Sequence, residues 1–168
     1  MATGTVSTAY GATPQYSVVN PATGARSSQA VALVDSGDQR AIASPTLLAQ
    51  TGAPQVSTKP VVGVDGAPTT APQYLVDWDL GRYGYVHAIA QDGSLIYTLG
   101  MDTSALGVQG LIGRNLLQTG QFSYDGPAGT FSLALGSAPP PRTAAPVSSW
   151  AMFGLLFGLG ALAVGAIG

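Results

Sequence analysis

The chain contains no cysteine and only one histidine, His87. The absence of cysteine excludes disulfides, thiolate metal sites and cysteine nucleophiles. A serine hydrolase triad would have to use His87, and the sequence has no G-x-S-x-G element to carry its nucleophile. No cluster of histidine and carboxylates suggests a metal site. Carboxylate chemistry is the enzyme chemistry that remains, and we expect it to need no cofactor.

Charge is also scarce. Charged residues make up 8% of the 168 residues, and the formal net charge is -2; in a typical soluble domain about a quarter of the residues are charged. The six basic residues are scattered, so they form no electrostatic footprint for nucleic acid. We therefore expect no nucleic-acid partner. The length allows one domain with tails.

Composition divides the chain into four segments. Residues 1–14 are rich in Ala, Thr, Ser and Gly without an apolar run, which predicts a flexible N-terminal arm. Residues 15–136 form the predicted domain, and residues 137–149 a Pro/Ala-rich linker. Residues 150–168 carry no charge, and at ~1.5 Å per helical residue they approach the ~30 Å hydrocarbon core. They predict a single C-terminal membrane helix, or alternatively a low-complexity apolar tail.

The domain shows many short strand signals. Apolar runs and turn residues predict strands over 16–19, 29–34, 40–43, 73–80, 85–90, 95–97, 122–124 and 130–133, and residues 60–66 predict a strand entering a hairpin. Ser44-Pro45 predicts a helix through Gln50 that stops at Gly52. A second short helix is expected over 114–118. Many strands with two small helices predict an all-β fold closed into a barrel.

Two motifs carry the functional argument. Residues 31–37 (VALVDSG) end an apolar strand with Asp35 on a Ser-Gly turn, where a carboxylate can face a cleft. Residues 111–117 (LIGRNLL) place an apolar pair and a glycine before a helix. Peptide hydrolysis without a metal, Cys or Ser-His needs two carboxylates that share one proton. The chain has one Asp-Ser-Gly, so such a pair requires a symmetric homodimer.

In this order the two motifs resemble those of the retropepsin-like aspartic proteases, which include the retroviral proteases. Residues 33–37 are similar to the hydrophobic-hydrophobic-Asp-Thr/Ser-Gly signature, and residues 112–117 to the segment that begins the helix in that family. Residues 124–133 resemble the closing hairpin of bacterial and cellular members. The resemblance covers residues 15–136 and implies a retropepsin-like barrel.

The resemblance also implies roles for individual residues. Asp35 is expected to be the catalytic residue, with Ser36 and Gly37 bracing the active-site turn between subunits. Ile112 and Gly113 are expected to line the cleft floor, and Arg114 to be a structural residue that pairs with an acid near the turn. The substrate-binding flap is expected at Gly63, Val64, Asp65 and Gly66.

The sequence departs from the family pattern in three places. Asp38 follows the motif where the family has a small residue, and a further carboxylate there opposes ionisation of the pair unless Arg114 or Arg40 neutralises it. Gln39 occupies the position of the acid that pairs with the arginine in retroviral enzymes, which makes Asp38 the substitute partner. Residues 67–70 (APTT) leave the flap region less rich in glycine.

Other polar and aromatic residues have simpler interpretations. Asp-Ser-Gly by itself is also a common turn between strands, and Asp65-Gly66 is a turn whether or not it forms a flap. His87 is interpreted as a surface or core residue, and Asp77 and Asp79 as one solvated strand face. The aromatic side chains of the domain are expected to pack its interior; they are Tyr74, Trp78, Tyr83 and Tyr85.

The leading hypothesis is thus a homodimeric aspartic endopeptidase that cleaves a polypeptide substrate. Its C-terminal helix would anchor it to a membrane, with Arg142 and the catalytic domain on the cytoplasmic side. One alternative is a non-catalytic, membrane-anchored β-domain that serves as a peptide-binding or assembly module. A second is a structural surface protein in which Asp-Ser-Gly is only a turn.

Overall fold

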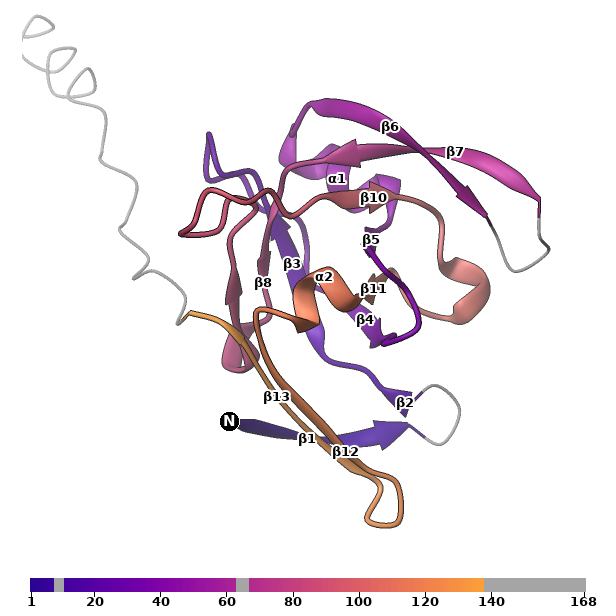
Figure 1. Cartoon of the computed structure of the whole chain (residues 1–168), viewed down its shortest axis with the longest axis vertical. Coiled ribbons are helices and arrows are strands. Elements are labelled where there is room, and N and C mark those ends of the chain that lie inside the picture. Colours follow the sequence, from indigo (N-terminus) through magenta and orange to yellow (C-terminus); the bar gives the residue numbers. More distant parts are fainter. Residues whose placement is uncertain (8–10, 63–66, 138–168) are drawn as a thin grey trace, which may run out of the picture.

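The computed structural model describes residues 1–7, 11–62 and 67–137. The strands are β1 (Ala2–Ser7), β2 (Gly11–Ala12), β3 (Gln15–Val19), β4 (Ala30–Val34), β5 (Ala41–Ala43), β6 (Gln55–Val62), β7 (Pro68–Tyr74), β8 (Asp77–Asp79), β9 (Gly84–Val86), β10 (Thr98–Gly100), β11 (Gly110–Ile112), β12 (Gly120–Asp125) and β13 (Thr130–Gly136). The helices are α1 (Pro45–Thr51), α2 (Arg114–Leu117) and the 3-10 turns η1 (Gly81–Tyr83) and η2 (Ser104–Leu106). The domain is all-β, as predicted (Figure 1).

The sheet is open, so the predicted closed barrel is wrong. Its strands follow the order β2-β1-β13-β9-β8-β3-β4-β11-β5-β10-β7-β6, and β12 pairs with β13. Within the described part of the chain no ladder joins β2 to β6. The β6–β7 hairpin runs along one end of the molecule, while β1, β12 and β13 lie at the other (Figure 1). Because the two terminal strands belong to opposite ends of the fold, each remains an edge.

The centre of the sheet is formed by strands that are distant in sequence. Strand β11 pairs in parallel with β4, with Leu111 opposite Leu33 and Ile112 opposite Val34. On its other side β11 pairs antiparallel with β5. Since β4 and β5 are joined by residues 35–40, the inserted β11 prevents them from closing into a hairpin. The connecting turn is thereby held open beside the start of α2.

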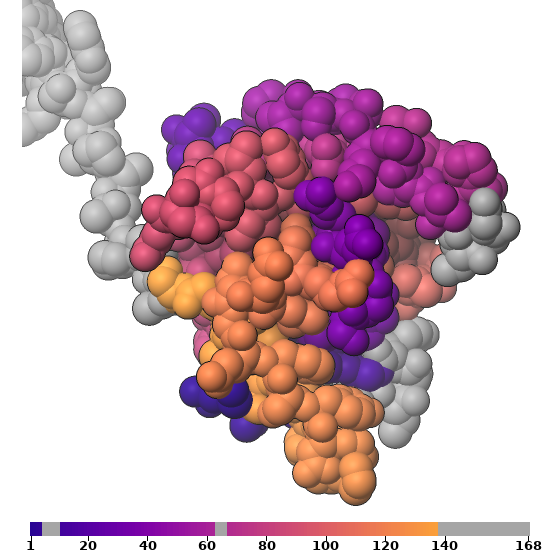
Figure 2. Space-filling view, viewed as in Figure 1, coloured from indigo at the N-terminus to yellow at the C-terminus, as the bar shows by residue number. Residues whose placement is uncertain are grey.

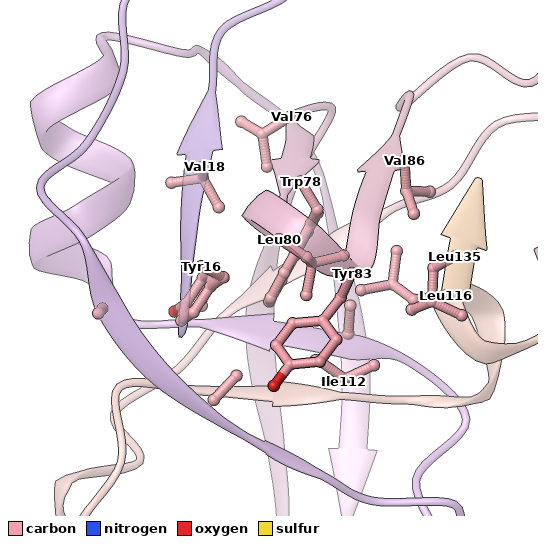
Figure 3. Close-up of a cluster of buried hydrophobic side chains, with 14 of the residues drawn as sticks. Tyr16, Val18, Val76, Trp78, Leu80, Tyr83, Val86, Ile112, Leu116 and Leu135 are labelled. Atoms are coloured by element: carbon pink, nitrogen blue, oxygen red, sulfur yellow. The ribbon is translucent and has the colours of Figure 1, made fainter. Parts of the chain in front are cut away.

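The larger hydrophobic core lies against one face of these central strands (Figure 3). Trp78 is fully buried and stacks on Tyr16, with ring centroids 4.4 Å apart and an interplanar angle of 14°. The indole N–H of Trp78 donates to Thr98 Oγ1 at 2.8 Å, and the Tyr16 hydroxyl donates to the carbonyl of Gln109 at 2.8 Å. Stacking of this kind adds about 0.5–1.5 kcal/mol to the burial of the rings. The expected packing role is confirmed for Trp78, Tyr83 and Tyr85, which are all buried.

A second apolar cluster lies on the opposite face of the same strands. Side chains alternate between the faces, so that Ala41 and Ala43 belong to the larger core and Ile42 to the second cluster. Leu111 also joins the second cluster, whereas Ile112 joins the first. Half-buried residues complete the second cluster; they are Val31, Leu33, Val61 and Met101. Coverage of both faces explains why β4, β5 and β11 are almost continuously apolar.

Both helices form where the sequence predicts them. Ser44 caps α1 by accepting a hydrogen bond from the Leu47 amide, Pro45 begins the helix, and Gly52 ends it with φ of 62°. Helix α2 begins at Arg114 directly after Gly113. These signals depend on residues within one turn of each helix end, so tertiary packing does not have to supply them.

Some segment boundaries differ from the predictions. Residues 2–7 are not an arm: they form β1, which pairs with β13 and β2. The predicted strand 73–80 is two strands, because β7 pairs with β6 and β10 whereas β8 pairs with β3 and β9.

Among the described residues no helix is long and apolar enough to span a membrane. The predicted membrane helix, residues 150–168, lies outside the described residues.

Candidate active site

Asp35 lies directly after β4, and three hydrogen bonds fix its position. Its amide donates to the carbonyl of Ile112 at 3.1 Å, so β11 anchors the residue after the last parallel pair. Its Oδ1 accepts from the amides of Gly37 at 2.9 Å and Asp38 at 3.3 Å. No hydrogen bond reaches Oδ2 from the described parts of the chain. One carboxylate oxygen is therefore held by the turn, and the other is available to a ligand.

The turn leaves this carboxylate accessible. Asp35 is half-buried, and Ser36 and Gly37 are exposed. A Cβ at Gly37 would lie 3.1 Å from Asp35 Oδ1, which is closer than most side-chain contacts. The φ of Gly37 is not positive, so this close approach, and not an unusual backbone conformation, is what favours glycine here. The motif thus brings an oriented carboxylate to the surface.

Helix α2 holds the far side of the turn. The Arg114 amide donates to the carbonyl of Asp38 at 2.9 Å, and the Asn115 amide donates to that of Gln39 at 3.3 Å. A Cβ at Gly113 would overlap the backbone of Arg40, so only glycine permits this approach. Residues 38–40 are consequently packed against the helix start through their backbone.

Asn115 was missed by the sequence analysis and is the main side-chain clamp of this region. Its Oδ1 accepts from the Ala41 amide at 2.7 Å, and its Nδ2 donates to the Tyr97 carbonyl at 2.9 Å. It joins α2, the start of β5 and the segment before β10. The available signal was an asparagine inside a short helix, where its side chain would otherwise compete with helical hydrogen bonds.

The expected cleft floor is wrong for Ile112. This side chain is 0% exposed and belongs to the larger core, and Gly113 is also buried against Arg40. In β11 the residue facing the second cluster is Leu111. The alternation of the strand therefore directs Ile112 into the larger core and Leu111 to the opposite face.

The expected ion pair of Arg114 with an acid near the turn is also wrong. The ion pairs found in the described residues are Arg26–Asp79 and His87–Asp77. Asp38 Oδ1 instead accepts the Arg40 amide at 3.1 Å. Arg114 is structural through its backbone amide, and its side chain is exposed.

The expected flap residues Gly63, Val64, Asp65 and Gly66 lie outside the described residues. The strands on either side of them are described. Strands β6 and β7 pair antiparallel up to Val62 opposite Pro68. The predicted hairpin is confirmed to this extent, and the role of its tip stays a prediction.

Asp77 and Asp79 are not a solvated face, because β8 is buried on both sides. Asp77 Oδ1 accepts from the Ala88 amide at 2.8 Å, and its Oδ2 accepts from the Tyr85 hydroxyl at 2.9 Å and lies 3.3 Å from Nδ1 of His87. Asp79 pairs with Arg26. Burial, followed by the hydrogen bond to Asp77, raises the pKa of Tyr85 above its usual value.

The candidate site is thus a carboxylate on an anchored turn, with no metal-binding set beside it. Among the described residues no group of three His, Asp or Glu side chains could hold a metal ion. No family model matches the chain, and no curated protein matches it either. The geometry of the turn is therefore the evidence that bears on function.

Proposed function

We propose that this chain is one subunit of a homodimeric aspartic endopeptidase in which each copy contributes Asp35. The observation that carries the proposal is the state of this carboxylate. Its Oδ1 is held by two amides of the turn, while no described residue hydrogen-bonds to its Oδ2. A free oxygen on an oriented carboxylate at the surface is what a second carboxylate or a catalytic water would contact.

The chemistry follows from pairing two such groups. Two carboxylates a few ångströms apart cannot both ionise, so they share one proton. The ionised member would take a proton from a water molecule, which attacks the scissile carbonyl carbon. The protonated member would hydrogen-bond to the carbonyl oxygen as it gains charge. Breaking the C–N bond would then transfer a proton to the leaving amine.

The fold supports a rigid placement of each Asp35. The turn is anchored to β11 on one side and to α2 on the other. Both anchors are backbone hydrogen bonds within the protein, so the turn does not need a substrate to take its shape. Catalytic groups act best when their geometry exists before the substrate binds.

The apolar second cluster supports an extended polypeptide as substrate. Val31, Leu33, Val61 and Met101 are only half-buried, so they offer apolar surface on the face of the sheet opposite the larger core. Strand β6 is a sheet edge, and an extended peptide can pair with such an edge through its backbone. These features would select apolar side chains in a strand conformation.

The decisive experiment is cleavage of a peptide library by the full chain and by its Asp35→Asn variant, at acidic and neutral pH. Asp35→Asn should abolish cleavage while sedimentation still detects the dimer. Asp102→Asn is a matched control, since Asp102 also accepts an amide in an exposed turn, from Ser104 at 2.9 Å. Its activity should stay near wild type. Equal cleavage by Asp35→Asn and the parent chain would refute the assignment.

The alternative is a non-catalytic, membrane-anchored β-domain that binds peptides or assembles with other chains. The edge position of β6 and its exposed Val56 and Val62 favour it, because an uncovered strand edge recruits further strands. In that case Asp35→Asn would retain the bound peptide, and the parent chain would cleave nothing under any condition.

A further inference from the structure

A concave site lies beside the candidate active-site turn. It has a volume of about 460 Å³ and is lined by Arg40 and Arg114, together with residues 94–96 and the exposed side of α2. Figure 2 shows the three contributing segments meeting on one face: the turn before β5, the loop before β10 and helix α2. Two guanidinium groups therefore line one depression.

Neither arginine is neutralised within the described chain. Arg40 and Arg114 take part in no ion pair there, and no acidic residue lines the depression. The nearest acid along the chain, Asp38, uses Oδ1 to accept the amide of Arg40. The guanidinium of Arg40 lies 5.9 Å from the centre of the Tyr97 ring, which limits its motion. The remaining polar lining includes Gln39 and Gln118, which add hydrogen-bonding groups.

We propose that Arg40 and Arg114 form a binding site for a carboxylate side chain of an acidic polypeptide, next to the turn that carries Asp35. A guanidinium presents parallel N–H donors that match the two oxygens of a carboxylate. The inference rests on the proposed function in one respect: the polypeptide is taken to be the substrate, which extends beyond the bond that is cleaved.

The shape of the surface favours a polypeptide over a small anion. A neighbouring cleft of about 430 Å³ shares Ser94, Ile96 and Gln118 with the arginine site. The two hollows are therefore adjacent, and an extended chain lying across Ser94 and Gln118 would contact both. Asp92 lines the neighbouring cleft, and hydrogen bonds from Ser94 lower the pKa of this carboxyl. Like-charge repulsion there would direct the acidic side chain to the arginine end.

The site also has a structural connection to Asp35. The Arg40 amide donates to Asp38, the Arg114 amide donates to the Asp38 carbonyl, and the Asp38 amide donates to Asp35 Oδ1. An acidic residue bound by the two arginines would thus be held against the backbone that orients Asp35. This contact would fix the register of the polypeptide relative to the carboxylate.

The test is calorimetric titration of the full chain, carrying Asp35→Asn to prevent cleavage, with a blocked peptide of alternating Asp and Ala. A second peptide has Asn in place of each Asp, and inorganic phosphate is a third probe. The acidic peptide should bind about tenfold more tightly than the Asn peptide, because hydrogen bonds to a charged carboxylate are stronger than those to a neutral amide. Its affinity should fall as ionic strength rises.

Substitutions assign the binding to the two arginines. Arg40→Gln and Arg114→Gln should each weaken the acidic peptide by about five- to tenfold, and Arg→Lys variants should recover part of the affinity because they keep the charge. Arg82→Gln is the matched control: it removes the same charge from an exposed arginine that stacks on Tyr83, and it should leave the affinity within about twofold.

The outcomes separate this inference from the proposed function. Equal weakening by Arg82→Gln would mean general electrostatic attraction and would overturn the inference. If phosphate binds as tightly as the acidic peptide, the site binds a small anion, and the assignment of a polypeptide ligand is overturned. If library peptides are cleaved without any preference for acidic residues, and Arg40→Gln does not change the cleavage, the arginine site is overturned but the proposed protease function stands. If the acidic peptide binds in an arginine-dependent way but the parent chain cleaves nothing, the binding site stands and the proposed protease function is refuted.

Discussion

Asn115 offers the sharpest test of how the candidate site is held together. Its side chain makes two hydrogen bonds, to the Ala41 amide at 2.7 Å and to the Tyr97 carbonyl at 2.9 Å. Asn115→Ala removes both. At a net value of about 1 kcal/mol each, the loss is about 2 kcal/mol. Ala41 is 0% exposed, so if no water reaches its amide the unsatisfied donor adds up to about 2 kcal/mol more. We expect destabilisation of about 2–4 kcal/mol.

Urea unfolding of the full chain measures this change as a shift of the midpoint at constant slope. Gln118→Ala, directly after the same helix, is the control, because its side chain is exposed and makes no side-chain hydrogen bond among the described residues. It should change stability by less than about 0.5 kcal/mol. The Gly37 amide resonance should shift in Asn115→Ala, since the turn loses a support. A loss below about 1 kcal/mol, with that resonance unmoved, would refute the clamp.

Three further predictions follow from other features. Gly113→Ala should destabilise the fold by about 3 kcal/mol or more, because the added Cβ would overlap the Arg40 backbone. Gly126→Ala is the control, since its Cβ would meet only the exposed Tyr124 ring. Equal denaturation midpoints for the two variants would contradict the packing of Gly113 against Arg40. Burial raises the pKa of Tyr16 above its usual value of 10.0, so the contribution of Tyr16 to stability is fully present below pH 10.0 and is lost as pH rises further. In that range the free energy of unfolding should fall by about 1.4 kcal/mol per pH unit because of Tyr16. A stability profile of Tyr16→Phe as steep as that of the parent chain would be the contrary result. If residues 150–168 anchor the chain, Leu156→Asp should weaken vesicle co-sedimentation by about 3 kcal/mol, whereas Val147→Asp in the linker should not; vesicle binding that Leu156→Asp leaves intact would argue against the anchor.

Local structure was largely predictable because its signals lie close together in the chain. The Ser44 side chain, Pro45 and Gly52 determine both ends of α1 without help from other elements. The β12–β13 hairpin has its turn signals in residues 125–129, where Asp125 accepts the Ala128 amide at 3.0 Å. The sequence likewise identified Asp35 as a carboxylate that follows an apolar strand on a Ser-Gly turn.

Burial of charged residues was harder to predict. Alternation in β8 indicated that Asp77 and Asp79 face solvent, yet both are buried. Strand β8 is flanked by β3 and β9, and its neighbours bring Arg26, Tyr85 and His87 to the two carboxylates. In a strand inside a sheet with both faces covered, successive residues no longer alternate between buried and exposed. Partners from other strands, which periodicity does not report, make this burial possible.

What the sequence by itself determined is the chemical inventory, without thiols and with a single histidine, and the position of Asp35 on a Ser-Gly turn after an apolar strand. The tertiary structure decided what holds that carboxylate and what surrounds it. Insertion of β11 between β4 and β5, the Asn115 clamp and the meeting of Arg40 with Arg114 at one depression all join segments far apart in the chain. Such pairings depend on the packing of the whole sheet, whereas turns and caps depend on neighbouring residues. Local signals therefore located the turn, and only the assembled fold supplied its supports.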